Sequence, residues 1–121
     1  MKKLTCFLTL VAFFVGFGTL QAAEAKVFLD RVEKSMKISG QMASGKVPYN
    51  SRAAVKEMIN IQNAVKAFDK TGRKTAPKNV ASCADKLKVY SVKGAVAAKA
   101  GHGAFKSVYG NLLNGYKDCK K

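Results

Sequence analysis

The residues of this chain with the most chemical potential are its few cysteines and its single histidine. The 121 residues include three cysteines, Cys6, Cys83 and Cys119, and one histidine, His102. Cys83 lies 18 residues before Gly101, and Cys119 lies 18 residues after it. If the chain folds back at Gly101, the two thiols reach the same end of a hairpin, and in an oxidising compartment we expect a disulfide. A thiol pair for metal binding or a redox couple is the alternative, although no second cysteine or histidine lies close to either residue.

The other side chains that could take part in catalysis do not form a recognisable set. Beyond the N-terminal segment there are six carboxylates, scattered and mostly beside lysines, as is typical of solvated helix faces: Asp30, Glu33, Glu57, Asp69, Asp85 and Asp118. The sequence contains no Ser/His/Asp arrangement, no phosphate-binding loop and no cluster of metal ligands. We therefore predict a protein that is not an enzyme and that has no metal and no resident cofactor.

The first 25 residues have the composition of a secretory signal peptide. Two lysines follow the initial methionine, an apolar run comes next, and Ala23-Glu24-Ala25 offers small residues where a signal peptidase cuts. We expect cleavage after Ala25, with loss of Cys6, and export to the periplasm or the medium; an uncleaved N-terminal anchor is the alternative. Residues 26–121 then form one domain, and no second apolar run in them is long enough to span a membrane.

The chain is strongly basic. It has 22 lysine and arginine residues against seven aspartate and glutamate residues, a formal net charge of +15, and loss of two lysines and Glu24 with the signal peptide lowers this to +14. Such a charge favours an anionic partner, either an acidic protein or an envelope surface, although scattered lysines also simply keep a protein soluble. The loop that contains Arg73, Lys74 and Lys78 could contact phosphates or could be only an exposed linker.

Four segments have the apolar spacing of amphipathic helices, and short breaks separate them. They cover about residues 26–43, 51–70, 79–100 and 104–119. In the second segment, apolar residues recur at alternating spacings of four and three, which is the seam of a packed helix: Ala54, Met58, Ile61, Val65 and Phe68. Glycine and proline residues occupy the breaks and favour chain reversals there.

The third segment is the least regular of the four. Val89, Val92 and Val96 spread apolar character around the helix, and Ser82–Asp85 is a capping-box sequence that would start the helix a turn later. The sequence Gly101-His102-Gly103 separates the last two segments, and we expect its histidine to be a solvated turn residue. Because four amphipathic helices with short connections pack together and no stretch alternates with a period of two, we predict an all-α antiparallel four-helix bundle.

The junctions between predicted helices are similar to those of a known family. Met42–Val55 reads MASGKVPYNSRAAV, and Ala97–Gly110 reads AAKAGHGAFKSVYG. The first resembles the junction between helices one and two of the class II c-type cytochromes (cytochrome c-prime), and the second resembles the turn between their helices three and four. These proteins are periplasmic four-helix bundles that hold haem near the end of the last helix, so the secretory signal agrees with the resemblance, which covers about half of the mature chain.

The haem-attachment sequence of that family is absent. In family members, Cys-x-x-Cys-His follows the Ala-Phe-x-x-Val stretch; the two cysteines bond haem and the histidine ligates iron. In this chain Leu112 and Gly115 stand where the cysteines belong, Tyr116 stands where the histidine belongs, and Cys119 lies one helical turn further on. The resemblance therefore implies a degenerate member of the family that lacks covalent haem.

The resemblance also indicates where haem would lie if it bound without covalent attachment. Tyr116 as a phenolate, or Cys119 as a thiolate outside a disulfide, could ligate ferric iron. Leu29 falls near the family position that faces the open side of the iron, and Met36 or Met42 could approach from the first helix. The ordinary alternative is that Tyr116 and the methionines only fill the core.

Three functional hypotheses follow. The leading one is a periplasmic, cytochrome c-prime-like bundle without covalent haem that acts as a non-enzymatic binding or structural protein. The first alternative is an electron-transfer or gas-binding protein with non-covalent haem, and the second is a cationic module that binds an acidic protein or an anionic envelope component. Because family members often dimerise through their first two helices, the resemblance also implies a homodimer.

Overall fold

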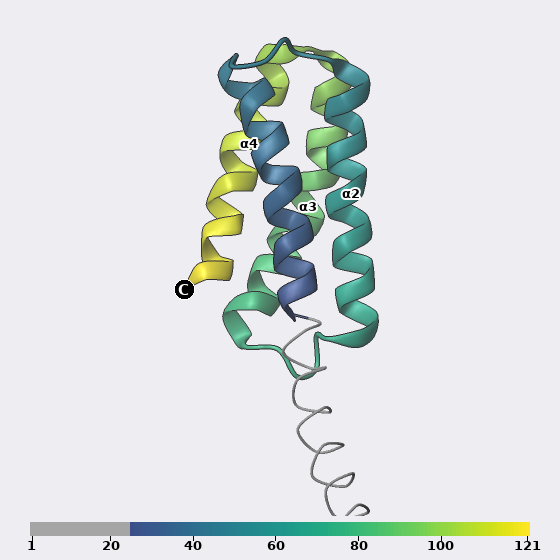
Figure 1. Cartoon of the computed structure of the whole chain (residues 1–121), viewed down its shortest axis with the longest axis vertical. Coiled ribbons are helices and arrows are strands. Elements are labelled where there is room, and N and C mark those ends of the chain that lie inside the picture. The colour runs from purple at the N-terminus through teal and green to yellow at the C-terminus, as the bar shows by residue number, and fades with distance from the viewer. Residues whose placement is uncertain (1–24) are drawn as a thin grey trace, which may run out of the picture.

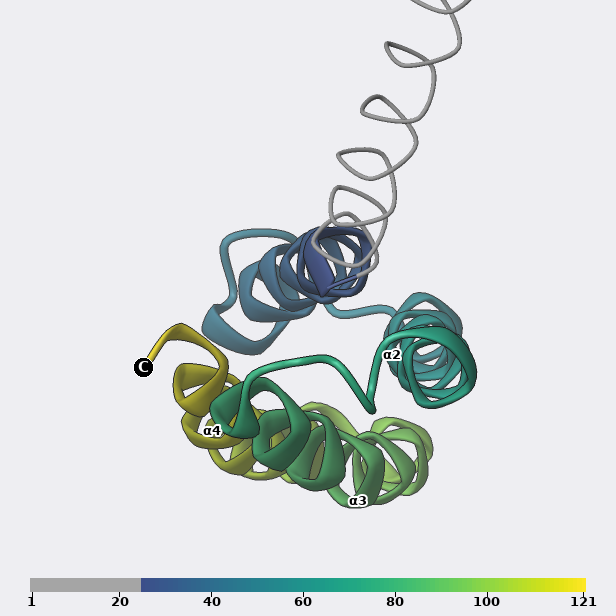
Figure 2. The ribbon, with the colours of Figure 1, turned by 90° about the horizontal axis from the view of Figure 1, so that it is seen from below.

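The computed structural model describes residues 25–121, which are almost entirely helical. The helices are the first helix (residues 25–44), α2 (Ser51–Thr71), α3 (Lys78–Ala100) and α4 (His102–Lys117), followed by the 3-10 turn η1 (Asp118–Lys120). They lie side by side as in a four-helix bundle, and residues 25–121 contain no strand, so the predicted all-α class is confirmed (Figure 1, Figure 2). Apart from Ala25, the predicted signal peptide lies outside the described residues and stays a prediction.

Helix α2 matches its predicted range because local signals define both ends. The side chain of Asn50 accepts a hydrogen bond of 3.0 Å from the backbone N–H of Ala53, which satisfies one free donor of the first turn. At the other end the N–H of Gly72 donates to the carbonyl of Phe68 at 2.8 Å. The predicted apolar seam is buried along its whole length.

Helix α3 begins at Lys78, so the alternative start at Ser82 is wrong. Pro77 precedes the helix with φ −57°, and its carbonyl accepts hydrogen bonds from the N–H groups of Val80 and Ala81 at 3.0 and 3.1 Å. The proline ring holds the backbone close to helical φ and needs no N–H partner, which favours helix initiation at this point. Ser82 therefore lies within the first turns of the helix and not at its cap.

The break between α3 and α4 is a single residue. Gly101 has φ +144°, a conformation that favours glycine, and its N–H donates to the carbonyl of Ala97 at 3.1 Å. His102 is therefore the first residue of α4 and not part of a turn, which corrects the sequence-based prediction. Although exposed, its ring stacks on Tyr49 with centroids 5.1 Å apart, and its Nε2 lies 3.1 Å from the carbonyl oxygen of Ala43.

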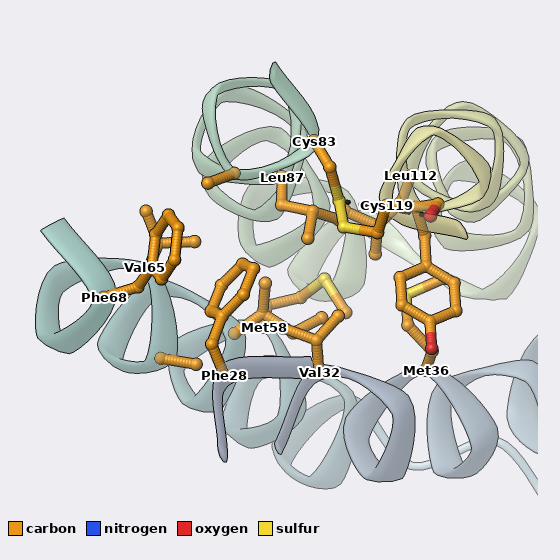
Figure 3. Close-up of a cluster of buried hydrophobic side chains, with 14 of the residues drawn as sticks. Phe28, Val32, Met36, Met58, Val65, Phe68, Cys83, Leu87, Leu112 and Cys119 are labelled. Carbon is orange, nitrogen blue, oxygen red and sulfur yellow. Dashed lines mark hydrogen bonds between the residues drawn. A yellow bond between two sulfur atoms is a disulfide. The ribbon is translucent and has the colours of Figure 1, made fainter. Parts of the chain in front are cut away.

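The core runs along the centre of the bundle and takes side chains from every helix (Figure 3). Phe28 of the first helix stacks on Phe68 of α2 with ring centroids 4.5 Å apart. Tyr109 of α4 donates a hydrogen bond of 3.1 Å to the carbonyl of Met36, across the bundle. A Cβ on Gly40 would lie 2.5 Å from the Tyr109 hydroxyl oxygen, so the small residue there leaves room for the Tyr109 side chain against the first helix.

Candidate functional site

An open pocket of about 680 Å³ lies at the end of the bundle that carries the disulfide. Its walls come from the first helix, from the α2–α3 connection with the start of α3, and from the end of α4 with η1. The lining is mainly apolar and includes Leu29, Ala76, Pro77, Val80 and Tyr116. A pocket of this size with a few polar groups at its edge is typical of sites for small organic molecules.

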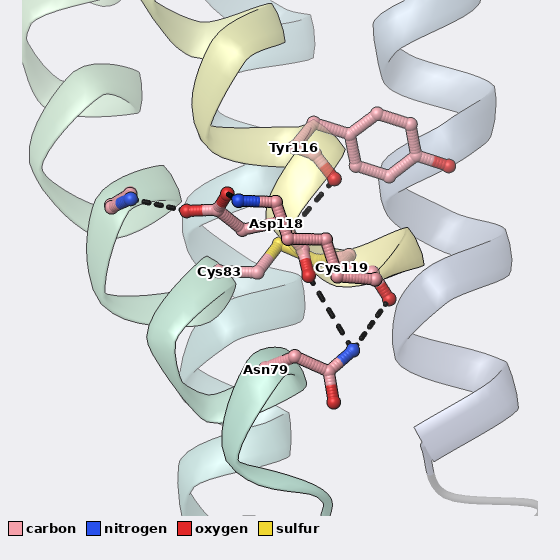
Figure 4. Close-up of a disulfide and its surroundings, with 7 residues drawn as sticks. Asn79, Cys83, Tyr116, Asp118 and Cys119 are labelled. Carbon is pink, nitrogen blue, oxygen red and sulfur yellow. Dashed lines mark hydrogen bonds and ion pairs between the residues drawn. A yellow bond between two sulfur atoms is a disulfide. The ribbon is translucent and has the colours of Figure 1, made fainter.

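Among residues 25–121, Tyr116 contributes the only aromatic ring to the pocket lining. Its side chain is 6% exposed and extends from α4 toward the first helix (Figure 4). Burial raises the pKa of its hydroxyl above the usual range, and the carboxylates of Glu33 and Asp30 raise this pKa further. The Nζ of Lys120 lies 5.0 Å from the centre of the ring, so the ring already has a cation on one face.

The disulfide between Cys83 and Cys119 anchors the wall formed by the end of the chain. It joins α3 to η1, with Cα atoms 5.1 Å apart, and both residues are buried. Asn79 adds two hydrogen bonds from its Nδ2, to the carbonyls of Asp118 at 3.4 Å and Cys119 at 3.2 Å (Figure 4). The last residues are therefore held on α3 by one covalent bond and by a local polar network.

The Asp118 carboxylate completes this network. Lys86 of α3 forms a close ion pair with it, and Lys121 lies 3.0 Å from its other oxygen. The hydrogen bonds from Lys86 and then Lys121 hold the pKa of Asp118 below its usual range. Asp118 therefore carries its negative charge at neutral pH and connects the end of the chain to α3.

The residues present do not fit the haem that the family resemblance implies. Neither Leu112 nor Gly115 has a thiol for a thioether bond, and the Cys119 sulfur is taken by the disulfide. Tyr116 is the remaining iron ligand, but ligation requires its phenolate, and burial with two nearby carboxylates disfavours that form. The pocket lining offers haem propionates two lysines and two carboxylates, so its charge gives them no net attraction.

Only two of the residues predicted for a haem site line the pocket, Leu29 and Tyr116. Leu112 is fully buried in the core, and Met36, which is 3% exposed, lies in the core away from the pocket lining. Gly115 packs on α3, because a Cβ there would lie 3.0 Å from the Cβ of Lys86. The pocket walls from the α2–α3 connection were not predicted, since nothing local in that segment indicates which helices it covers.

In the predicted basic loop, Arg73 forms ion pairs, whereas Lys74 and Lys78 are exposed. Arg73 forms ion pairs with Asp69, at 2.8 Å, and with Asp85, and these two partners raise the pKa of its guanidinium above its ordinary value. It therefore connects α2 to α3, a role that its spacing of four from Asp69 could have indicated. Lys74 is exposed, and Lys78, also exposed, is the first residue of α3.

Within residues 25–121, no helix combines the length and the apolar character needed to cross a membrane. In the same range no three His, Cys, Asp or Glu side chains gather where they could hold a metal ion. Comparison of the chain with models of protein families, with curated proteins and with solved structures finds no match. Function must therefore be inferred from the geometry of the chain itself.

Proposed function

We propose that this chain is a non-enzymatic binding protein of the periplasm that holds a small apolar molecule in the pocket between Leu29 and Tyr116. Its architecture is an antiparallel four-helix bundle of the cytochrome c-prime type, cut from a precursor after Ala25, in which covalent haem attachment has been lost. The observation that supports this proposal is the pocket of about 680 Å³ with its mainly apolar lining. The position of the pocket at the end of α4 agrees with the position of haem in the family that the chain resembles.

The mature chain, residues 26–121, is the material for the test, and it keeps every residue of the pocket lining except Ala25. N-phenyl-1-naphthylamine, an uncharged apolar dye that becomes fluorescent in apolar surroundings, is titrated and its contacts are mapped by NMR chemical shifts. We expect shifts at Leu29, Val80 and Tyr116, and a loss of affinity of at least tenfold in Ala76→Phe, which fills the pocket. Ala67→Phe, an exposed position on α2, is the matched control and should bind as the parent does.

Two results would contradict the proposal: the absence of shifts at the pocket residues, or an equal loss of affinity in both variants. Addition of hemin to the same protein tests the haem alternative. A Soret band that Tyr116→Phe abolishes would show that haem is the ligand after all. We expect no such band, because the environment of Tyr116 disfavours a phenolate.

The ion pairs favour a second candidate function, the binding of an anionic partner. Within the described residues only three basic side chains, Arg73, Lys86 and Lys121, have a carboxylate within 4.0 Å. The other lysines and arginines contribute an unbalanced positive charge, which attracts polyanions over long range. Binding that weakens steeply as salt rises would support this function, and binding that does not respond to salt would exclude it.

A further inference from the structure

A second concave site lies between the first helix and α2, separate from the apolar pocket. It is a groove of about 380 Å³, and its lining is Arg31, Lys34, Ser35, Ile38, Lys56, Glu57 and Asn60. The first helix and α2 are neighbours in the bundle (Figure 2). No residue of this lining belongs to the lining of the pocket at the disulfide end.

Three positive side chains face this groove without an ionic partner. Among residues 25–121, Arg31, Lys34 and Lys56 have no carboxylate oxygen within 4.0 Å. Arg31 and Lys34 are one helical turn apart on the first helix, and Lys56 comes from α2. The positive charges therefore come from both walls, so their long side chains can converge on one anion between them.

The one carboxylate in the lining does not cancel this charge. Glu57 is 8% exposed, and one of its oxygens accepts a hydrogen bond of 3.2 Å from Asn60. With three positive groups and one negative group, the lining has a net charge of about +2. Because the whole chain is strongly basic, its field would steer an anion toward this surface and would not oppose its entry.

We propose that this groove is a binding site for a phosphate group, with Arg31, Lys34 and Lys56 as its ligands. A phosphate offers more acceptor oxygens than a carboxylate and carries up to two negative charges, which suits three convergent cations. Arg31 can supply two parallel hydrogen bonds, and the two lysines act as point charges. The proposal rests on the second candidate function, the binding of an anionic partner, and gives that function a location and a ligand chemistry.

The experiment uses the mature chain and two pairs of substitutions that change net charge equally. Lys34→Gln with Lys56→Gln removes two groove cations, and Lys99→Gln with Lys106→Gln removes two exposed cations from α3 and α4. The probes are glycerol 1-phosphate in solution and vesicles that contain phosphatidylglycerol. Binding is followed by NMR shifts of the backbone amides and by co-sedimentation with the vesicles.

We expect glycerol 1-phosphate to shift amides around Lys34 and Lys56, and the groove pair to weaken its binding at least tenfold. The control pair should change affinity less than twofold. Binding to vesicles alone, with the same dependence on the groove pair, would identify the phosphate as a lipid headgroup; binding of the soluble probe would identify a free phosphorylated molecule.

Equal weakening by both pairs would overturn the site and leave general attraction between the basic chain and anions. Absence of binding to both probes at low salt would overturn the site and would leave an acidic protein as the partner for the second candidate function. Neither result would affect the apolar pocket, because its lining shares no residue with the groove. Normal helix content of each variant, measured by circular dichroism, excludes unfolding as the cause of a loss.

Discussion

Reduction of the disulfide should lower the stability of the bundle by a large and calculable amount. Cys83 and Cys119 are 36 residues apart in sequence. In the chain-entropy model, a closed loop of this size stabilises the folded state by about 4 kcal/mol at 25 °C. For a domain of fewer than 100 residues this corresponds to a change in Tm of about 15–30 °C. The effect is a large fraction of the total stability expected for a small domain.

The measurement is urea unfolding of the mature protein followed by circular dichroism, with and without a phosphine reductant. Reduced parent protein is the better comparison, because substitution of two buried cysteines also changes packing. The Cys83→Ala/Cys119→Ala variant serves as the control, and reductant should have no effect on it. Oxidised and reduced parent proteins whose unfolding free energies agree within about 1 kcal/mol would refute the entropic reasoning for this chain.

Three further predictions concern packing and charge. Gly94→Ala should lower stability by about 1 kcal/mol, since its Cβ would lie 2.5 Å from the buried Met58 sulfur. Gly110→Ala has open space around it and should raise stability by about 0.5–1 kcal/mol. Urea unfolding that ranks the two variants in the opposite order would contradict this packing. Burial raises the pKa of Tyr109, so the stability that its neutral, part-buried side chain contributes is lost as pH rises above about 10, where the unfolded state ionises first. Absorbance at 295 nm should show a late phase, to which Tyr116 also contributes, and Tyr109→Phe should make this phase smaller. Lys86 and Lys121 lower the pKa of Asp118, so the stability that its ion pairs contribute is present above about pH 4 and disappears as pH falls through the lowered pKa. Asp118→Asn should therefore be less stable than the parent at pH 7 and equal to it in strong acid.

The helices could be predicted from the sequence because each has a periodic apolar face between strong breaks. The apolar seam of α2 lies between Asn50 and Gly72, and both act as caps in the structure. The pairing of Cys83 with Cys119 followed from their equal distance to Gly101, where the chain reverses. These features depend on local chemistry and on simple geometry, which a single sequence contains.

The features that could not be predicted depend on contacts between distant segments. The position of His102 between two glycines indicates a turn, yet this residue starts α4 and stacks on Tyr49, which comes from the connection before α2. Likewise, the pocket requires Ala76 to lie near Leu29 and Tyr116, and no local pattern relates these three positions. The groove between the first helix and α2 was missed for the same reason, because each helix alone shows only solvated charges.

The two proposed sites differ in how the fold prepares them. The pocket wall that contains Tyr116 is attached to α3 through the disulfide and Asn79, and the opposite wall is held where Phe28 stacks on Phe68. Because the walls of the pocket are already fixed, little free energy is spent on ordering them when a ligand binds. The groove has fixed helices but long, exposed side chains, such as that of Lys34, which must lose rotamer freedom when they close on an anion. Selectivity is therefore expected from the shape of the pocket, and salt-dependent attraction from the charge of the groove.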